Sequence, residues 1–98
     1  MKIWMRKPQE QEGTHKFSGT FLVTAGVMSA LSPEEMLAIY LDIQVLVRIK
    51  GGIDYFQVYE NAAGDKLYFI DNCDPDLKEP ELSMVEFNYC TLLFSHEY

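Results

Sequence analysis

The chain has 98 residues, of which 48% are apolar and 13% aromatic, and its net charge is −7. The length excludes two independent hydrophobic cores, and the composition excludes an intrinsically disordered chain, which lacks the apolar surface that offsets ordering entropy. The acidic charge disfavours direct binding to nucleic acid, because phosphates repel a negative surface.

The sequence also excludes a helical membrane span, since it contains no apolar run of about 18 residues. The basic start, residues 1–7, is followed by polar residues rather than by the apolar region of a signal peptide. We therefore expect a soluble cytoplasmic protein with no membrane contact. In that compartment Cys73 and Cys90 are expected to be reduced, half-buried thiols.

Residues 1–16 are polar and weakly patterned, which predicts an N-terminal arm ahead of a single domain over residues 17–98. Trp4 is the exception, because a lone tryptophan in a mobile tail would expose a large apolar surface. We expect Trp4 to dock on the body of the domain or on a partner. The first predicted strand lies near Thr20 to Thr24, in a run rich in β-branched and aromatic residues.

A helix is predicted to begin at Pro33. Ser32 is a candidate N-cap, Pro33 suits the first helical position, and Glu35 stands where it closes a capping box. Residues 41–49 also alternate as a strand would, but the helical spacing of apolar residues and the stop at Gly51 favour helix throughout. Such a helix is apolar on both sides, which indicates that other parts of the protein cover both sides or that one side forms an interface.

Two adjacent antiparallel strands are predicted at Asp54 to Glu60 and Lys66 to Asp71, because a short glycine-containing loop joins them. A fourth strand is predicted at Met84 to Phe94. The order is β-α-β-β-β, so we predict an α+β fold with one helix packed on a mostly antiparallel sheet.

The charge is unevenly distributed along the chain. Residues 1–52 hold six Lys or Arg against five Asp or Glu, a net +1, whereas residues 53–98 hold two against ten, a net −8. Such a field favours a partner protein with a basic surface. Tyrosine and tryptophan are the residue types that anchor interfaces. The candidate partner-binding residues are therefore Asp71, Asp74, Asp76, Glu79, Glu81, Glu86, Tyr55, Tyr59 and Trp4.

No motif in the sequence indicates an enzymatic activity. The chain has no P-loop, no G-x-S-x-G, no G-x-G-x-x-G and no H-E-x-x-H, and neither of its two histidines sits near a plausible nucleophile in sequence. The acidic segment after Asp71 lacks the glycine and the terminal glutamate of a calcium loop. We expect no catalytic residue, no metal and no cofactor, so the protein is predicted not to be an enzyme.

Several short motifs carry a resemblance to a known family. They are V-T-A-G-V at 23–27, L-S-P-E-E at 31–35, D-Y-F at 54–56, Y-F-I-D at 68–71, D-P at 74–75 and L-L-F-S-H-E-Y at 92–98. Over about residues 20–98 the chain resembles small proteins of bacterial plasmids, phages and mobile elements that are known only as a domain of unknown function. The resemblance implies a phage or mobile-element setting.

These observations together lead to a functional hypothesis. We expect an inhibitor of a bacterial defence system, of the anti-CRISPR or anti-restriction type, that covers a basic site on its target stoichiometrically with its acidic surface. The alternative is a small homodimeric structural or regulatory protein-binding module with no anti-defence role. A small enzyme that modifies a defence protein or a nucleotide is a third hypothesis, and it would require a pocket that the sequence does not reveal.

Overall fold

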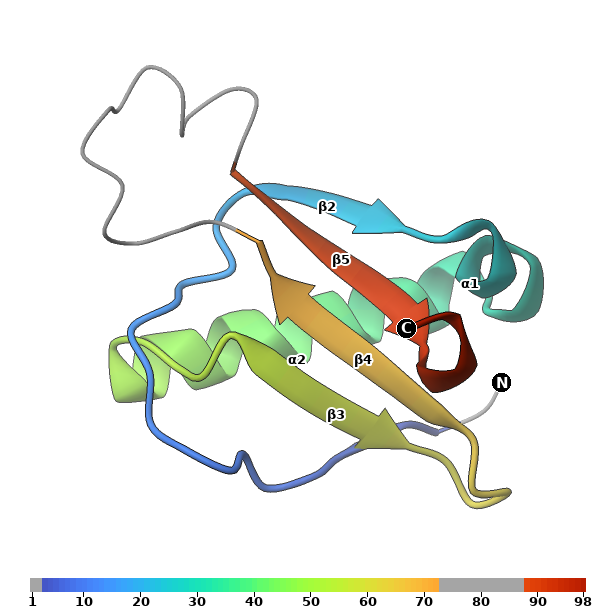
Figure 1. Ribbon diagram of the computed structural model, residues 1–98, viewed down its shortest axis with the longest axis horizontal. Helices are drawn as coiled ribbons and strands as arrows, with labels where there is room; N and C mark the ends of the chain where they lie inside the picture. The colour runs from blue at the N-terminus through green and yellow to red at the C-terminus, as the bar shows by residue number, and fades with distance from the viewer. Residues whose placement is uncertain (1–2, 73–87) are drawn as a thin grey trace.

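The computed structural model describes residues 3–72 and 88–98, which form a five-stranded sheet with a long helix against one of its faces (Figure 1). The strands are β1 (Met5–Arg6), β2 (Thr20–Val23), β3 (Phe56–Glu60), β4 (Lys66–Asp71) and β5 (Tyr89–Phe94). The helices are α1 (Ala25–Ala30) and α2 (Pro33–Lys50), and a single 3₁₀ turn, η1, spans Ser95–Glu97. The predicted α+β class is confirmed.

The strands lie in the order β1-β3-β4-β5-β2. Neighbours in the series β1, β3, β4 and β5 are antiparallel, whereas β2 pairs with β5 in parallel. It follows that β2 and β3 run in the same direction with β4 and β5 between them. Parallel strands need a long crossover connection, and the segment that contains α2 supplies it.

Local signals set the limits of α2 as the sequence predicted. The Ser32 hydroxyl accepts a hydrogen bond from the Glu35 backbone N–H at 3.1 Å, and the Glu35 carboxylate accepts one from the Ser32 N–H at 3.1 Å. The helix ends at Gly51, whose φ of 77° lies in the left-handed region that favours glycine. Residues 41–49 are helical because Ile39 and Ile43 on the same face are buried against the sheet.

The core lies between α2 and the face of the sheet that α2 covers. Alternate residues of β3, β4 and β5 are buried, in the period of two that a sheet with one covered face produces. The buried apolar residues are Phe17, Val27, Leu31, Ile39, Ile43, Ile53, Tyr59, Leu67, Phe69, Cys90 and Leu92.

The N-terminal segment that was predicted as an arm packs on the body. β1 extends the sheet at the free edge of β3, and His15 pairs with Ile53 through two backbone hydrogen bonds of 2.9 Å. Between these points the Gln9 side chain accepts from the Asp54 N–H at 3.1 Å and from the Gln57 side-chain amide at 3.0 Å. The segment therefore contributes its own hydrogen bonds to the sheet.

Phe17 is held in an unusual backbone conformation, with a φ of 49° in the left-handed region. Its N–H donates to the Asp71 carboxylate at 3.1 Å, and its carbonyl accepts from the Gln44 side chain at 2.8 Å. Its ring is fully buried and meets Phe69 edge-on, with 4.9 Å between ring centroids. These contacts compensate for the backbone strain and link β4 and α2 to the start of β2.

Three elements of the fold were not predicted: β1, α1 and the turn η1. Helix α1 has six residues, and its N-cap is Thr24, whose hydroxyl accepts from the Val27 N–H at 3.3 Å. All three elements are too short for periodicity to reveal them. Neither helix of the described residues is long and apolar enough to cross a membrane.

Candidate binding surfaces

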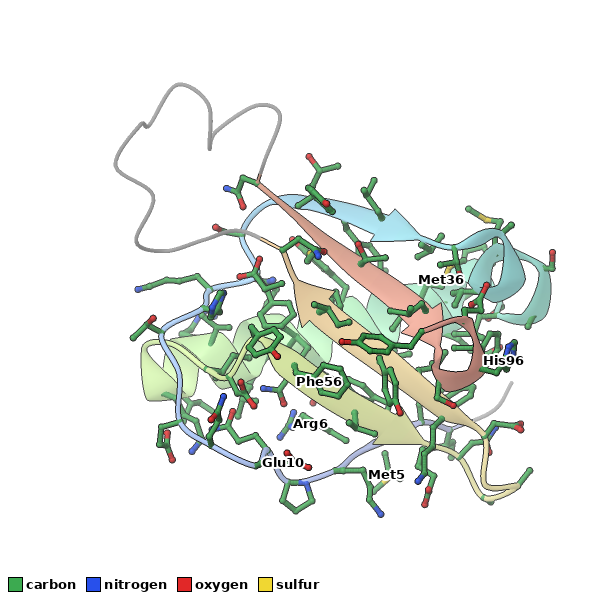
Figure 2. The ribbon with its side chains drawn as sticks, viewed as in Figure 1. Met5, Arg6, Glu10, Met36, Phe56 and His96 are labelled. Carbon is green, nitrogen blue, oxygen red and sulfur yellow. The ribbon has the colours of Figure 1, made fainter. Side chains whose placement is uncertain are left out.

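The sheet has one face that no helix of the described residues covers. In Figure 1 α2 lies behind the sheet, and in Figure 2 Phe56 stands on the side that faces the viewer. Residues on this open face come from the alternate positions that α2 does not bury, and they are partly exposed. The apolar and aromatic members on β3, β4 and β5 are Phe56, Val58, Tyr68, Ile70, Tyr89 and Leu93.

Three aromatic rings form a cluster on the open face. The centroid of Phe56 lies 4.7 Å from that of Tyr68, and the ring of Tyr98 lies 5.9 Å from Phe56 and 5.6 Å from Tyr68. Both contacts of Tyr98 are edge-on, a preferred geometry for aromatic pairs. Tyr98 nevertheless stays 75% exposed, so the cluster presents an aromatic surface to solvent. We call Phe56, Tyr68 and Tyr98 the aromatic cluster.

The turn η1 directs Tyr98 back onto the sheet. The Glu97 carboxylate accepts from the Phe94 N–H at 2.9 Å and from the Thr24 hydroxyl at 2.7 Å, which ties the turn to β5 and to the start of α1. These hydrogen bonds lower the pKa of Glu97 below its usual value. At neutral pH Glu97 is therefore ionised and fixes the turn.

A second exposed apolar surface lies on α2, on the side that faces away from the sheet. Its residues recur every four positions and so form one row along the helix. They are Leu37, Leu41, Val45 and Ile49, with 55%, 51%, 52% and 75% exposure. We call them the α2 stripe. The sequence prediction that α2 is apolar on both sides is confirmed, and in the described residues its outer side is open.

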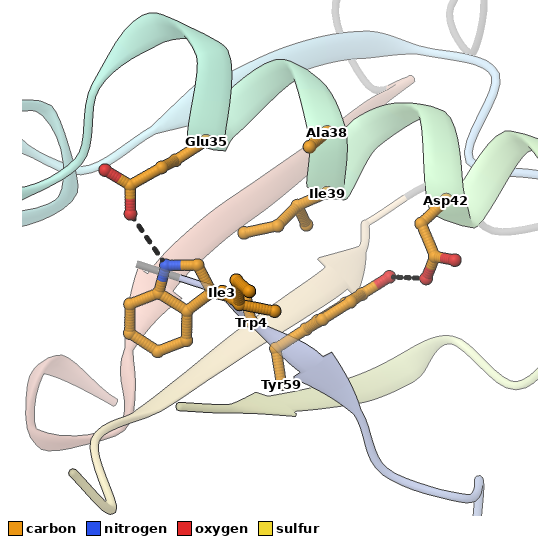
Figure 3. Close-up of a pocket in the computed structure, with 7 residues that line it drawn as sticks. All are labelled: Ile3, Trp4, Glu35, Ala38, Ile39, Asp42 and Tyr59. Atoms are coloured by element: carbon orange, nitrogen blue, oxygen red, sulfur yellow. Dashed lines mark hydrogen bonds between the residues drawn. The ribbon is translucent and has the colours of Figure 1, made fainter. Parts of the chain in front are cut away.

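A hollow of about 290 Å³ lies between α2 and the N-terminal segment (Figure 3). The Trp4 indole N–H donates to Glu35 at 3.0 Å, and the Tyr59 hydroxyl donates to Asp42 at 2.6 Å. Arg6 also donates to Asp42. Of the two placements expected for Trp4, the structure shows the one on the body, where it packs against the core.

The acidic groups of this hollow serve the fold. Burial by itself raises the pKa of Glu35, but the hydrogen bonds from Ser32 and Trp4 prevail and hold it below its usual value. Burial, with the hydrogen bond to Asp42, raises the pKa of Tyr59 far above its ordinary value. An ionised carboxylate and a neutral phenol, each already bonded, are suited to fastening the N-terminal segment rather than to proton transfer.

The predicted partner-binding residues fall into three groups. Asp71 and Tyr59 are 5% and 1% exposed, and Trp4 is part-buried, so these side chains act inside the protein. Tyr55 is 43% exposed and lies beside the aromatic cluster, with its ring centroid 6.1 Å from Phe56. The remaining predictions lie outside the described residues: Asp74, Asp76, Glu79, Glu81 and Glu86.

Asp71 shows that an acidic residue predicted to lie on the surface can be buried in the folded protein. It closes β4 on the face that α2 covers, and there it accepts from the Phe17 N–H and lies 3.2 Å from the His15 ring. Because side chains alternate along a strand, the residue after partly exposed Ile70 turns inward. Asp71 therefore contributes to the interior of the protein rather than to an exposed partner surface.

The aromatic cluster and the α2 stripe were absent from the predicted binding residues. The sequence did contain a signal for the aromatic face, because Phe56, Val58 and Tyr68 fall at alternate positions of two strands that were predicted to pair. The position of Tyr98 had no such signal, since it depends on the turn that follows β5.

Cys90 is wholly buried rather than half-buried, and it is a free thiol. Burial, together with the charge of Asp71, raises its pKa to about 12. In a Cys73→Ser variant, which isolates this thiol, we expect alkylation by iodoacetamide at pH 8 to be at least about 100-fold slower in the folded than in the urea-unfolded protein. Equal rates measured by mass spectrometry would contradict this burial.

No metal-binding arrangement occurs among residues 3–72 and 88–98, in the sense that no three His, Cys, Asp or Glu side chains are grouped to hold an ion.

Comparison with known proteins finds no matching family model, no similar curated protein and no similar solved structure.

Proposed function

We propose that the open face of the sheet binds a partner protein with a basic surface. The observation that carries this proposal is that β3, β4 and β5 all come from residues 53–98, the half of the chain with a net charge of −8. Among the described residues of that half, 53–72 and 88–98, five Asp or Glu stand against one Lys, so the strands of this face come from an acidic part of the chain that also exposes aromatic rings. Arginine side chains suit such a surface, because guanidinium groups stack on aromatic rings and are attracted by the charge.

The biological role we propose is stoichiometric inhibition of a bacterial defence system, of the anti-CRISPR or anti-restriction type. Defence nucleases hold nucleic acid in basic channels, which are targets for an acidic protein. The resemblance of the short motifs to plasmid, phage and mobile-element proteins supports this setting, in which the protein would act in the host cytoplasm. The inhibitor acts by occupying the basic site, without catalysis and without contacting nucleic acid itself.

The test is a DNA-cleavage assay with a panel of purified CRISPR effector nucleases and restriction endonucleases. Inhibition is expected to be complete near one equivalent of protein per target and to weaken as the salt concentration rises. Tyr98→Ala removes an exposed ring and is expected to weaken inhibition about tenfold. Met28→Ala, which truncates an exposed side chain on α1 and leaves the charge unchanged, is the matched surface control and is expected to retain inhibition.

Charge is tested separately from the aromatic cluster. An Asp76→Lys, Glu79→Lys, Glu81→Lys variant changes only acids that lie outside the described residues. If these charges contribute, its inhibition is weaker and less sensitive to salt. Inhibition of a target that is unchanged in both this variant and Tyr98→Ala would overturn the proposed mode of binding. Inhibition far below one equivalent would indicate an enzyme instead.

The α2 stripe favours a second candidate function, a homodimeric structural or regulatory module with no anti-defence role. A stable dimer that inhibits no member of the panel, and that leaves phage plating unchanged when expressed in a bacterium with CRISPR immunity, would support this candidate.

A further inference from the structure

Three members of the α2 stripe, Leu37, Leu41 and Val45, are symmetric about Leu41. Leu37 and Val45 each stand four positions from Leu41, and the exposed charges Glu34 and Arg48 each stand seven positions from it. Four and seven positions are both close to whole numbers of turns, so these side chains lie on the same side of the helix as Leu41. One sign of charge therefore stands at each end of the apolar segment from Leu37 to Val45.

This arrangement is complementary to itself. When a second copy of α2 lies antiparallel with Leu41 at the two-fold axis, Leu37 faces the partner's Val45 and Glu34 faces the partner's Arg48. Both pairs occur twice, as an isologous interface requires. Parallel pairing would instead place Glu34 beside the partner's Glu34 and Arg48 beside the partner's Arg48, which costs free energy. Antiparallel helix dipoles also attract.

We propose that the protein forms a two-fold dimer through antiparallel pairing of the α2 stripe with that of a second copy. The stripe is already exposed and α2 is already packed on its other side, so pairing requires no rearrangement of the core. From Leu37 to Ile49 the row spans about 18 Å, long enough for helix–helix packing at an axis separation of about 9 Å.

The dimer leaves both open sheet faces free. The stripe points away from the sheet, so the layers run sheet, α2, α2 and sheet, with the two aromatic clusters on opposite outer surfaces. Dimerisation and partner binding then use different surfaces, and the dimer does not rest on the proposed function. A dimer that also binds targets would carry two of them.

Sedimentation equilibrium over about 5 to 500 µM tests the pairing, because four aliphatic side chains per copy form a small interface with an expected dissociation constant on the order of tens of micromolar. Leu41→Glu sets two carboxylates against each other at the axis and is expected to weaken the dimer at least about 100-fold. Ala62→Glu, at the exposed turn between β3 and β4, is the control and is expected to dimerise normally. Unchanged circular dichroism would show that both variants fold.

Charge exchange tests the antiparallel orientation. Glu34→Lys and Arg48→Glu each place like charges together at both ends, and each is expected to weaken the dimer about three- to tenfold. Mixing the two variants restores opposite charges at both ends, so the mixed dimer is expected to be as tight as the unaltered one. A chain that is monomeric at about 500 µM, a Leu41→Glu dimer of unchanged affinity, or a mixture no tighter than its components would overturn the proposal.

Discussion

Phe69→Ala is expected to lower the free energy of unfolding by about 3 to 5 kcal/mol, because it leaves a cavity at the centre of the core. Phe69 is fully buried and its ring meets Phe17 and Phe21 at centroid distances of 4.9 and 5.4 Å. Urea unfolding followed by circular dichroism at low-micromolar protein concentration measures the change. Native domains are stable by only about 5 to 15 kcal/mol, so the variant is expected to be marginally folded at 37 °C.

The control for this prediction is Met28→Ala on α1. Met28 is 60% exposed, so its truncation is expected to change the free energy of unfolding by less than about 0.5 kcal/mol. A loss for Phe69→Ala that is no larger than the loss for Met28→Ala would mean that the sheet and α2 do not enclose Phe69 as described.

Asp71→Ala is expected to cost about 2 to 4 kcal/mol of stability, because it removes the acceptor of a buried backbone N–H. Without the carboxylate the N–H of Phe17 has no described partner, and the left-handed backbone there loses one of the two hydrogen bonds that hold it. Asp71→Asn keeps an acceptor oxygen and is expected to lose less than half as much. Urea unfolding of the two variants, measured together, gives the comparison.

This pair of variants also separates the two roles considered for Asp71. If the residue belonged to a partner surface, Asp71→Ala would weaken target inhibition at full stability. We expect the opposite result, with inhibition unchanged at temperatures where the variant is folded and a lower melting temperature.

The sequence by itself determined the features that depend on neighbouring residues. The start of α2 follows from the capping box between Ser32 and Glu35, its end from Gly51, and β3 and β4 from two short β-rich runs around a glycine-containing turn. These are local effects, in which residues a few positions apart satisfy each other's hydrogen bonds. The α+β class followed from them.

Only the tertiary structure decided which residues are available for binding. Asp71 and Tyr59 look like surface residues in the sequence, yet the face of the sheet on which they fall is the one that α2 covers. Tyr98 joins Phe56 and Tyr68 because a turn after β5 folds it back, over a contact that spans 42 positions from Phe56. Which face of a sheet is covered and which segment adds an edge strand are settled by packing between distant parts of the chain, where the free energy of burial outweighs local preference.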